Sequence, residues 1–143
     1  MLAQPYLNFD GRCQEAIDFY QKTLGAEVTM LMRFKDNPEP LSADCPHDPA
    51  AAADAAEKVM HSALRIGETM VMATDGYNTG ETKFSGFSLS LTVNSDAEVK
   101  RCFDALADGG QATMPPAKTF FASSFGMVTD RFGVSWMILA SPQ

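Results

Sequence analysis

Apolar and polar residues alternate most clearly in the segment FSLSLTV at residues 87–93. Successive side chains of a strand point to opposite faces, so this segment predicts a strand with one apolar face and one face lined by Ser88, Ser90 and Thr92. Similar reasoning predicts the strand 85–94 around this segment and further strands at 28–34, 61–66, 69–75, 112–114, 123–130 and 134–140. Turn residues separate neighbouring strands at Gly67-Glu68 and Arg131-Phe132-Gly133.

Two other segments carry apolar residues at helical spacing. The first stripe is Ala16, Phe19, Tyr20 and Leu24, and the second is Val99, Phe103 and Leu106. A glycine follows each stripe, at Gly25 and Gly109, where a helix end favours a residue that tolerates positive φ. The pattern therefore predicts one helix in each half of the chain.

The two halves also form an internal repeat. Residues 7–30 and 91–114 align at a constant offset of 84 residues and share Leu7/Leu91, Phe19/Phe103, Gly25/Gly109, Thr29/Thr113 and Met30/Met114. Each copy runs strand, turn, helix, glycine, strand, and further strands follow. We therefore expect an α+β fold of two βαβββ modules, about 1–80 and 81–143, which together form a single domain over residues 1–143.

A segment rich in proline and alanine, residues 36–57, interrupts the first module. Its first part predicts a loop, and residues 49–57 predict a short helix with Asp48 as N-cap and Pro49 at the first helical position. Cys45 and His47 stand here among aspartates, but a proline-containing loop offers no framework for a coordination sphere. We expect no metal there.

Composition narrows the function. The net charge is −7 and the Lys and Arg residues are scattered, which argues against nucleic acid as a partner. No segment has the roughly 18 apolar residues of a membrane helix, and the first residues do not resemble a signal peptide. Three cysteines at wide spacing suit a reduced compartment, so we expect a cytoplasmic protein with free thiols.

Three segments, YLNFDGRCQEAIDFYQKTLGAE, HSALRIGETMVMATD and FGMVTDRFGVSWMIL, together resemble the vicinal-oxygen-chelate superfamily of glyoxalases, bleomycin-resistance proteins and dioxygenases. Within it they resemble the PhnB-like branch, often labelled 3-demethylubiquinone 3-methyltransferase. The resemblance implies two modules whose sheets curl into one U-shaped cleft, and it implies a homodimer.

The resemblance also implies where a metal would be held. The four ligand positions of metal-using relatives fall on Pro5, Met72, Ser88 and Met137. Proline has no side-chain donor, and thioether or hydroxyl groups bind Zn²⁺, Ni²⁺ and Mn²⁺ poorly. We therefore expect no metal and no cofactor. A Rossmann-type methyl-donor site would need a glycine-rich turn, whereas the turn at Asp10-Gly11-Arg12 has a single glycine.

Strand alternation extends these positions to a predicted ligand-binding face. Leu7 and Phe9 share the parity of Pro5, and Met70 shares that of Met72. Ser90 shares that of Ser88, while Trp136 and Ile138 point away from Met137. Phe120, Phe121 and Phe125 cluster around the start of the predicted strand 123–130, where they either close over a ring of the ligand or pack as ordinary core residues. The complete predicted set is Leu7, Phe9, Met70, Met72, Ser88, Ser90, Phe120, Phe121, Phe125 and Met137, a lining that suits a small, partly apolar ligand.

His61 is the candidate catalytic residue. It shares a strand face with Ala63 and Arg65, opposite Leu64 and Ile66, and an imidazole there is either a general base, a hydrogen-bond donor or a structural group at a strand end. Three functions stay open. The first is a metal-independent binder of a small molecule. The second is an enzyme of lyase, dioxygenase or transferase type that uses His61 or an unexpected metal, and the third is a scaffold whose dimer surface is functional.

The remaining reactive side chains predict structural roles. Cys13 and Cys102 lie in the two predicted helices, where buried packing is the usual role of cysteine. Asp75 and Asp130 follow strands, at ends where we expect their charge to be solvated. None of these residues suggests a nucleophile or a catalytic acid.

Overall fold

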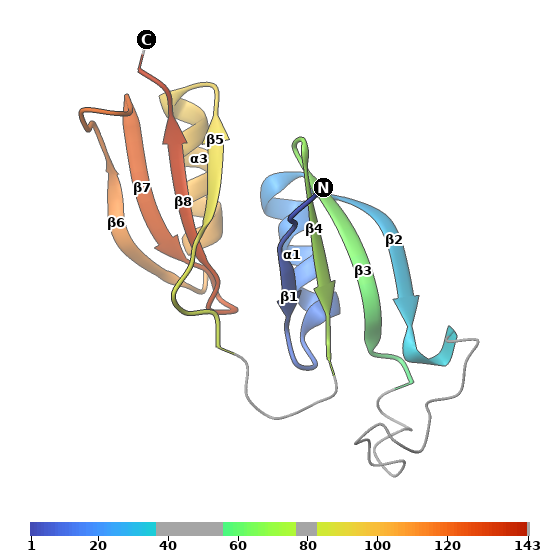
Figure 1. Cartoon of the computed structure of the whole chain (residues 1–143). Helices are drawn as coiled ribbons and strands as arrows, with labels where there is room; N and C mark the ends of the chain where they lie inside the picture. The colour runs from blue at the N-terminus through green and yellow to red at the C-terminus, as the bar shows by residue number, and fades with distance from the viewer. Residues whose placement is uncertain (37–55, 77–82, 143) are drawn as a thin grey trace. The chain divides into compact units, whose positions relative to one another are not determined.

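The computed structural model describes residues 1–36, 56–76 and 83–142 and divides the chain into two compact units, Met1–Thr82 and Lys83–Gln143 (Figure 1). The first unit contains β1 (Tyr6–Asn8), α1 (Cys13–Leu24), β2 (Glu27–Arg33), the 3₁₀ turn η1 (Phe34–Asp36), β3 (Val59–Ile66) and β4 (Thr69–Thr74). The second contains β5 (Leu89–Val93), α3 (Asp96–Ala107), β6 (Gln111–Ala117), β7 (Ser124–Thr129) and β8 (Ser135–Ala140).

Both units have the same sheet topology. The strand order is β1-β4-β3-β2 in one sheet and β5-β8-β7-β6 in the other. In each sheet the first strand of the unit pairs in parallel with the last, and the remaining neighbours are antiparallel. The α+β fold of two βαβββ modules predicted from the repeat is therefore confirmed.

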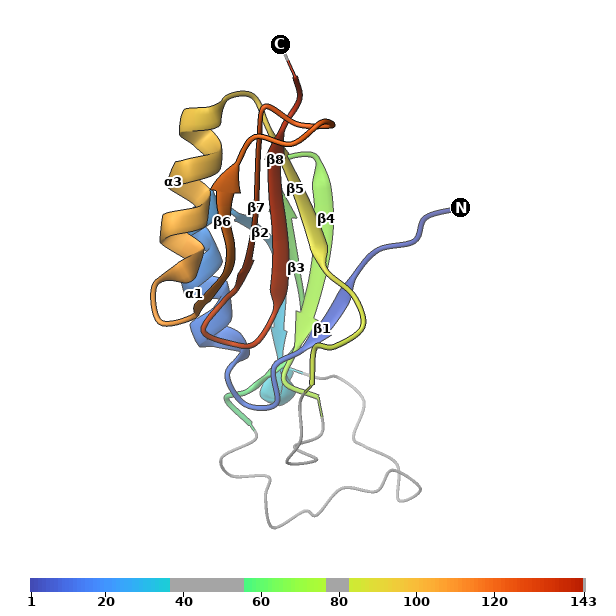
Figure 2. The same cartoon turned by 90° about the vertical axis from the view of Figure 1, so that its left-hand side faces the viewer.

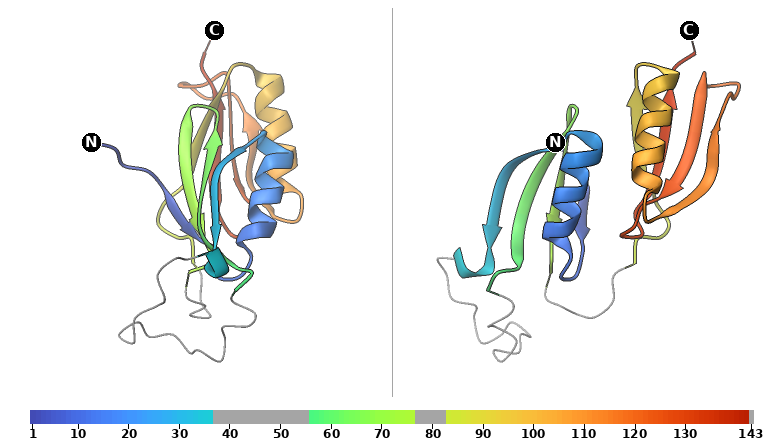
Figure 3. Two further views of the ribbon diagram at one scale, coloured as in Figure 1. Left: turned by 90° about the vertical axis from the view of Figure 1, so that its right-hand side faces the viewer. Right: turned by 180° about the vertical axis from the view of Figure 1, so that it is seen from behind.

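Each helix lies along one side of its own sheet (Figures 2 and 3). The predicted apolar stripes face these sheets, and additional buried residues extend them. The buried side chains are Cys13, Ala16, Ile17, Phe19, Tyr20 and Thr23 in α1, and Val99, Cys102, Phe103 and Leu106 in α3. Leu24, predicted for the first stripe, is only half-buried at the last turn. Gly25 ends α1 in the left-handed conformation at φ 66°, as predicted.

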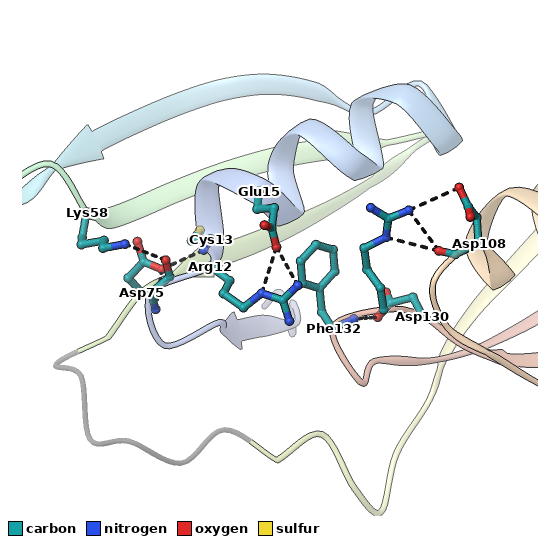
Figure 4. Close-up of polar contacts among 10 residues, drawn as sticks. Arg12, Cys13, Glu15, Lys58, Asp75, Asp108, Asp130 and Phe132 are labelled. Carbon is teal, nitrogen blue, oxygen red and sulfur yellow. Dashed lines mark hydrogen bonds and ion pairs between the residues drawn. The ribbon is translucent and has the colours of Figure 1, made fainter.

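The two strand-end aspartates are buried, which corrects the expectation that their charge is solvated. Each is only 3% exposed. The Asp75 carboxylate accepts hydrogen bonds at 2.8 Å from the backbone N–H groups of Gly11, Cys13 and Val59. Figure 4 shows Asp75 next to Cys13 at the start of α1. The carboxylate thereby satisfies the start of α1, where the N-cap residue Arg12 makes no side-chain capping bond.

Asp130 has the matching role in the second unit. Its carboxylate accepts from the backbone N–H groups of Phe132 at 2.9 Å and Val134 at 3.0 Å, and from Trp136 Nε1 at 2.9 Å. The bond to Phe132 is drawn in Figure 4. These bonds tie the turn between β7 and β8 to the strand that follows. A buried carboxylate is tolerated in both units because several donors surround it.

A few predicted boundaries change, and others lie outside the described residues. β5 is shorter than the predicted strand 85–94, because pairing with β8 begins only at Leu89. The predicted helix at 49–57 lies outside the described residues except for Ala56 and Glu57, as do Cys45 and His47. None of the helices in the described ranges is long and apolar enough to span a membrane.

Candidate functional site

The candidate site is built on the face of each sheet that points away from its helix, which we call the open face. In the first unit, strand pairing aligns Tyr6, Met72, Ala63 and Met30 across all four strands. We call this set the first row. Its members are exposed or half-buried, with Tyr6 51% exposed, whereas Leu64 and Val71 on the helix side are buried.

The predicted parity of the first strand is wrong by one residue. Leu7 pairs with Ala73 on the helix side and is 3% exposed, while Tyr6 pairs with Met72 on the open face. Phe9 is 4% exposed and its ring lies 6.2 Å from that of Tyr20 on α1, measured between centroids. Apolar Leu7 and Phe9 are buried in the core under α1, and the structure gives them no place on the open face.

The second unit carries an equivalent row. Ser90, Met137, Met127 and Met114 are aligned across β5, β8, β7 and β6, and we call them the second row. Burial alternates along β8, where Trp136 and Ile138 are buried and Met137 is half-buried, as predicted. Met72 and Met137 therefore occupy corresponding places in the two sheets. Met70 lies two residues from Met72 on the same face, paired with Arg65.

A pair of hydroxyl groups lies beside the second row. Ser88 precedes β5, and its hydroxyl lies 2.8 Å from that of Ser135 at the start of β8. Each hydroxyl can donate one hydrogen bond and accept two, so the pair keeps capacity for a further partner. Ser88 and Ser90 are thus on the hydroxyl-lined side of the second open face.

The three predicted phenylalanines do form a cluster. The rings of Phe120 and Phe121 meet edge to face with centroids 5.1 Å apart, and Phe121 meets Phe125 in the same way at 5.1 Å. Phe125 pairs with Leu139 on the open face, whereas Phe120 is 97% exposed. Phe120 also contributes to a hollow of about 450 Å³ lined by Asp96, Lys118, Thr119, Phe120, Ala122, Ser123 and Pro142.

A second hollow, of about 490 Å³, lies at the end of the first sheet and is lined by Leu24, Gly25, Glu27, Arg65, Gly67 and Glu68. Arg65 and Glu27 form an exposed ion pair there. None of the predicted ligand-binding side chains lines this hollow. The two rows, and not this hollow, therefore form the candidate site.

His61 lies on the open face of the first sheet, as its alternation predicts. β3 buries Ser62, Leu64 and Ile66 and leaves His61 and Ala63 half-buried. The Tyr6 hydroxyl lies 2.9 Å from His61 Nδ1, and the two ring centroids are 5.5 Å apart. A titratable imidazole is thereby fixed next to the first row.

The two helical cysteines are not activated thiols. Burial, reinforced by the charge of Asp75, raises the pKa of Cys13 to about 12. Burial also raises the pKa of Cys102, although the guanidinium of Arg101 opposes this shift. A nucleophilic cysteine needs the opposite shift, so both thiols pack as small apolar groups.

Within residues 1–36, 56–76 and 83–142, no three His, Cys, Asp or Glu side chains gather in a way that could hold a metal ion. Of the four positions implied by the resemblance, Pro5 contributes only its carbonyl, which accepts a hydrogen bond of 2.9 Å from the Met72 N–H. Tyr6, not Pro5, presents its side chain beside Met72. The first row therefore offers a phenol and thioethers as donors.

Tyr6 was missed by the sequence analysis, although the repeat contains the signal for it. The offset of 84 residues that aligns Leu7 with Leu91 also aligns Tyr6 with Ser90 and Met30 with Met114. These pairs are the two ends of the two rows. Applying the clear alternation of β5 to the first strand would have identified Tyr6.

Comparison with known proteins places the chain in a family. The sequence profile described as 3-demethylubiquinone-9 3-methyltransferase matches residues 3–139. Protein YjdN of Escherichia coli (strain K12) is 38% identical over 138 residues, which cover 96% of this chain and 94% of YjdN. The crystal structure of protein PA1353 from Pseudomonas aeruginosa is 39% identical, covers 100% of this chain and 99% of that one, and superposes with a TM-score of 0.82.

More distant structures show the fold alone. A putative 3-demethylubiquinone-9 3-methyltransferase, PhnB protein, from Bacillus cereus is 24% identical, with a TM-score of 0.75 and coverage of 99% of this chain and 100% of that one. A glyoxylase/bleomycin resistance protein/dioxygenase domain from Frankia sp. EAN1pec is 13% identical, with a TM-score of 0.64 and coverage of 99% and 98%. With two βαβββ modules and a profile match over residues 3–139, the chain belongs to the 3-demethylubiquinone-9 3-methyltransferase family.

Proposed function

We propose that this protein binds a small, partly apolar ligand on the open faces of its sheets without using a metal ion. The observation that carries the proposal is the composition of the two rows. Thioether, phenol and hydroxyl groups stand at paired positions on the open faces, with Met72 and Met137 at corresponding places. The side chains of Met70, Ser88 and Phe125 extend the two rows on the same open faces.

The donor set supports the absence of a metal from the mechanism. Zn²⁺, Ni²⁺ and Mn²⁺ prefer imidazole, carboxylate or thiolate ligands, and thioethers are poor substitutes. The rows offer Met30, Met72, Met114, Met127 and Met137 instead. His61 lies beside the first row as a strong metal donor, and the Tyr6 hydroxyl already lies 2.9 Å from its Nδ1.

The same donor set supports an apolar ligand. The thioether side chain is flexible and polarisable, so it adapts its shape to an aromatic or aliphatic body. A small number of hydrogen-bonding groups then orients the ligand. Here those groups are the Tyr6–His61 pair in the first unit and the Ser88–Ser135 pair in the second.

The family description names a methyl transfer, but this chain offers no support for a Rossmann-type methyl-donor site. Such a site needs a glycine-rich turn between a strand and a helix. The turn between β1 and α1 contains Gly11 alone. The homodimer, the cytoplasmic location and the single-domain organisation remain predictions from the sequence and the resemblance.

Metal analysis tests the proposal. The purified protein would be incubated in turn with Zn²⁺, Ni²⁺ and Mn²⁺, desalted, and its metal content measured by elemental analysis. We expect substoichiometric metal in every sample, because no row presents a suitable set of donors. About one ion per wild-type chain after desalting would contradict the proposal and would favour a metal-dependent enzyme.

A further inference from the structure

We propose that Tyr6 holds His61 with its Nε2 atom as a hydrogen-bond donor, so that the first open face selects a partly apolar ligand that carries a hydrogen-bond acceptor. This inference rests on the proposed function, because it names the class of ligand that the face takes. It also assigns two roles. His61 is a specificity-determining residue, and Tyr6 is the residue that positions it.

The arrangement depends on the order of the strands. Tyr6 belongs to β1 and His61 to β3, and β4 lies between them in the sheet. The Tyr6 side chain reaches across that strand, and its hydroxyl lies 2.9 Å from His61 Nδ1. The rings are tilted by 35° with centroids 5.5 Å apart. This contact leaves Nε2 as the nitrogen that is available to a ligand.

The chemistry of the two groups decides which one donates. A phenol O–H is a good donor, and the unprotonated imidazole nitrogen, with its in-plane lone pair, is a better acceptor than a phenol oxygen. The favoured bond therefore runs from the Tyr6 hydroxyl to Nδ1. The neutral ring must then carry its hydrogen on Nε2. If the ring is protonated, both nitrogens carry hydrogen, the Tyr6 oxygen accepts from Nδ1, and Nε2 still donates.

This arrangement is the reverse of that in a catalytic triad. There a carboxylate, which only accepts, holds the hydrogen on Nδ1 and leaves Nε2 as a general base. A phenol next to Nδ1 has the opposite effect on a neutral imidazole. His61 is therefore set to recognise an acceptor oxygen, and it lacks the free lone pair at Nε2 that proton abstraction requires.

The neighbours of this pair define the rest of the ligand. Met72 pairs with Tyr6, and Met32 pairs with His61 on β2. In the part of the chain that the structure describes, no protein group bonds to Nε2. A donor N–H among thioethers matches a neutral carbonyl or ether oxygen, or a phenolate, on an aromatic or aliphatic body.

The first test measures the tautomer without any ligand. The chain has two histidines, so a His47→Gln background leaves the signals of His61 alone. Long-range ¹H–¹⁵N NMR at about pH 9, where imidazole side chains in water are neutral, distinguishes the two tautomers. The Nε2–H tautomer of a neutral histidine already predominates in water. The test therefore depends on the population of the minor Nδ1–H tautomer. We expect no detectable Nδ1–H form, and its appearance in the matched variant Tyr6→Phe.

The second test uses two probes of similar shape, acetophenone with its carbonyl acceptor and ethylbenzene without it. We expect the wild type to bind acetophenone more tightly than ethylbenzene. In His61→Phe the affinity for acetophenone should fall roughly fivefold, as for the loss of one hydrogen bond, and the affinity for ethylbenzene should be unchanged. Amide NMR spectra would verify that each variant is folded.

The outcomes separate this inference from the proposed function. A mainly Nδ1–H ring in the wild type would overturn the inference even if both probes bind, and would restore His61 as a candidate base. An unchanged preference for acetophenone in His61→Phe would also overturn it. The expected tautomer without binding of either probe would contradict both the ligand class and the proposed binding function.

Discussion

The two helices begin in different ways, although the two units share one topology. α3 starts at Ser95, whose hydroxyl accepts a hydrogen bond of 3.2 Å from the Glu98 N–H, a cap that is local in sequence. α1 has no such cap, and Asp75 at the end of β4 accepts from the N–H of Cys13 instead. The repeated element order is compatible with two different polar networks, one local and one formed only after folding.

The two open faces also share one set of side chains and differ in another. Methionines occupy corresponding places at Met72 and Met137, and the outer strands end the rows with Met30 and Met114. The polar groups differ, with a phenol–imidazole pair in one unit and two serine hydroxyls in the other. The shared part suits adaptable apolar contact, and the divergent part gives each face its own hydrogen-bonding selectivity.

Replacement of the two buried aspartates has the largest expected effect. Asp75→Ala leaves three N–H groups from two distant segments of the first unit without their acceptor, whereas Asp130→Ala removes the acceptor of Phe132 and Val134 in its own turn and of Trp136 in β8. We expect the free energy of unfolding to fall by about 4 kcal/mol in Asp75→Ala and about 3 kcal/mol in Asp130→Ala. Urea denaturation followed by circular dichroism measures both.

The control is Asp104→Ala, which removes an exposed carboxylate paired with Lys100 in α3. An exposed pair of this kind contributes about 0.5 kcal/mol or less. If Asp75→Ala were as mild as this control, the capping of α1 by a distant residue would be unimportant. The contrast between the two helix starts would then be lost.

The thiols of Cys13 in α1 and Cys102 in α3 should make smaller contributions to the free energy of unfolding, and these contributions depend on pH. The pKa of Cys13 is raised from 9.0 to about 12 in the folded protein. Above about pH 9 the unfolded chain loses this proton and the folded chain keeps it, so the free energy of unfolding falls as pH rises towards 12. The fall is at most about 1.4 kcal/mol per pH unit from this group, and it is absent below pH 9.

Denaturation between about pH 8 and pH 11 in wild type, Cys13→Ala and Cys102→Ala would measure this contribution. Cys13→Ala should remove more of the slope than Cys102→Ala, because the charge of Arg101 partly offsets the burial of Cys102. Equal slopes in all three proteins would mean that the thiols contribute nothing. A larger change in Cys102→Ala would reverse the expected order of the two units.

Much of the fold was predictable because its signals are local or repeated. The alternation at 87–93 identified the open face of β5, and the parity of His61, Met72 and Met137 was also correct. The predicted face of the first strand was wrong because it was inferred from Pro5, an implied ligand position. Leu7 and Phe9, which share the parity of Pro5, were therefore placed on the wrong face. The internal repeat, which pairs Tyr6 with Ser90, was the more reliable guide.

The polar contacts could not be predicted because they depend on register between distant strands. Tyr6 and His61 are separated by 55 residues and meet only when β1, β4 and β3 are paired as observed. Cys13 and Asp75 are separated by 62 residues. No local pattern in the sequence encodes such a pairing, and an aspartate at a strand end looks the same whether it is solvated or buried.

Metal-independent binding on the open faces can be measured directly through the methionine side chains. The nine methionine methyl groups would be labelled with ¹³C, assigned by single Met→Leu variants, and followed by NMR during titration with acetophenone in excess EDTA. We expect shifts of the Met72 methyl signal and of its neighbours in the first row, with Met1 unchanged as the internal control. Shifts that appear only after Zn²⁺, Ni²⁺ or Mn²⁺ replaces EDTA, or that leave both rows unaffected, would contradict metal-independent binding on the open faces.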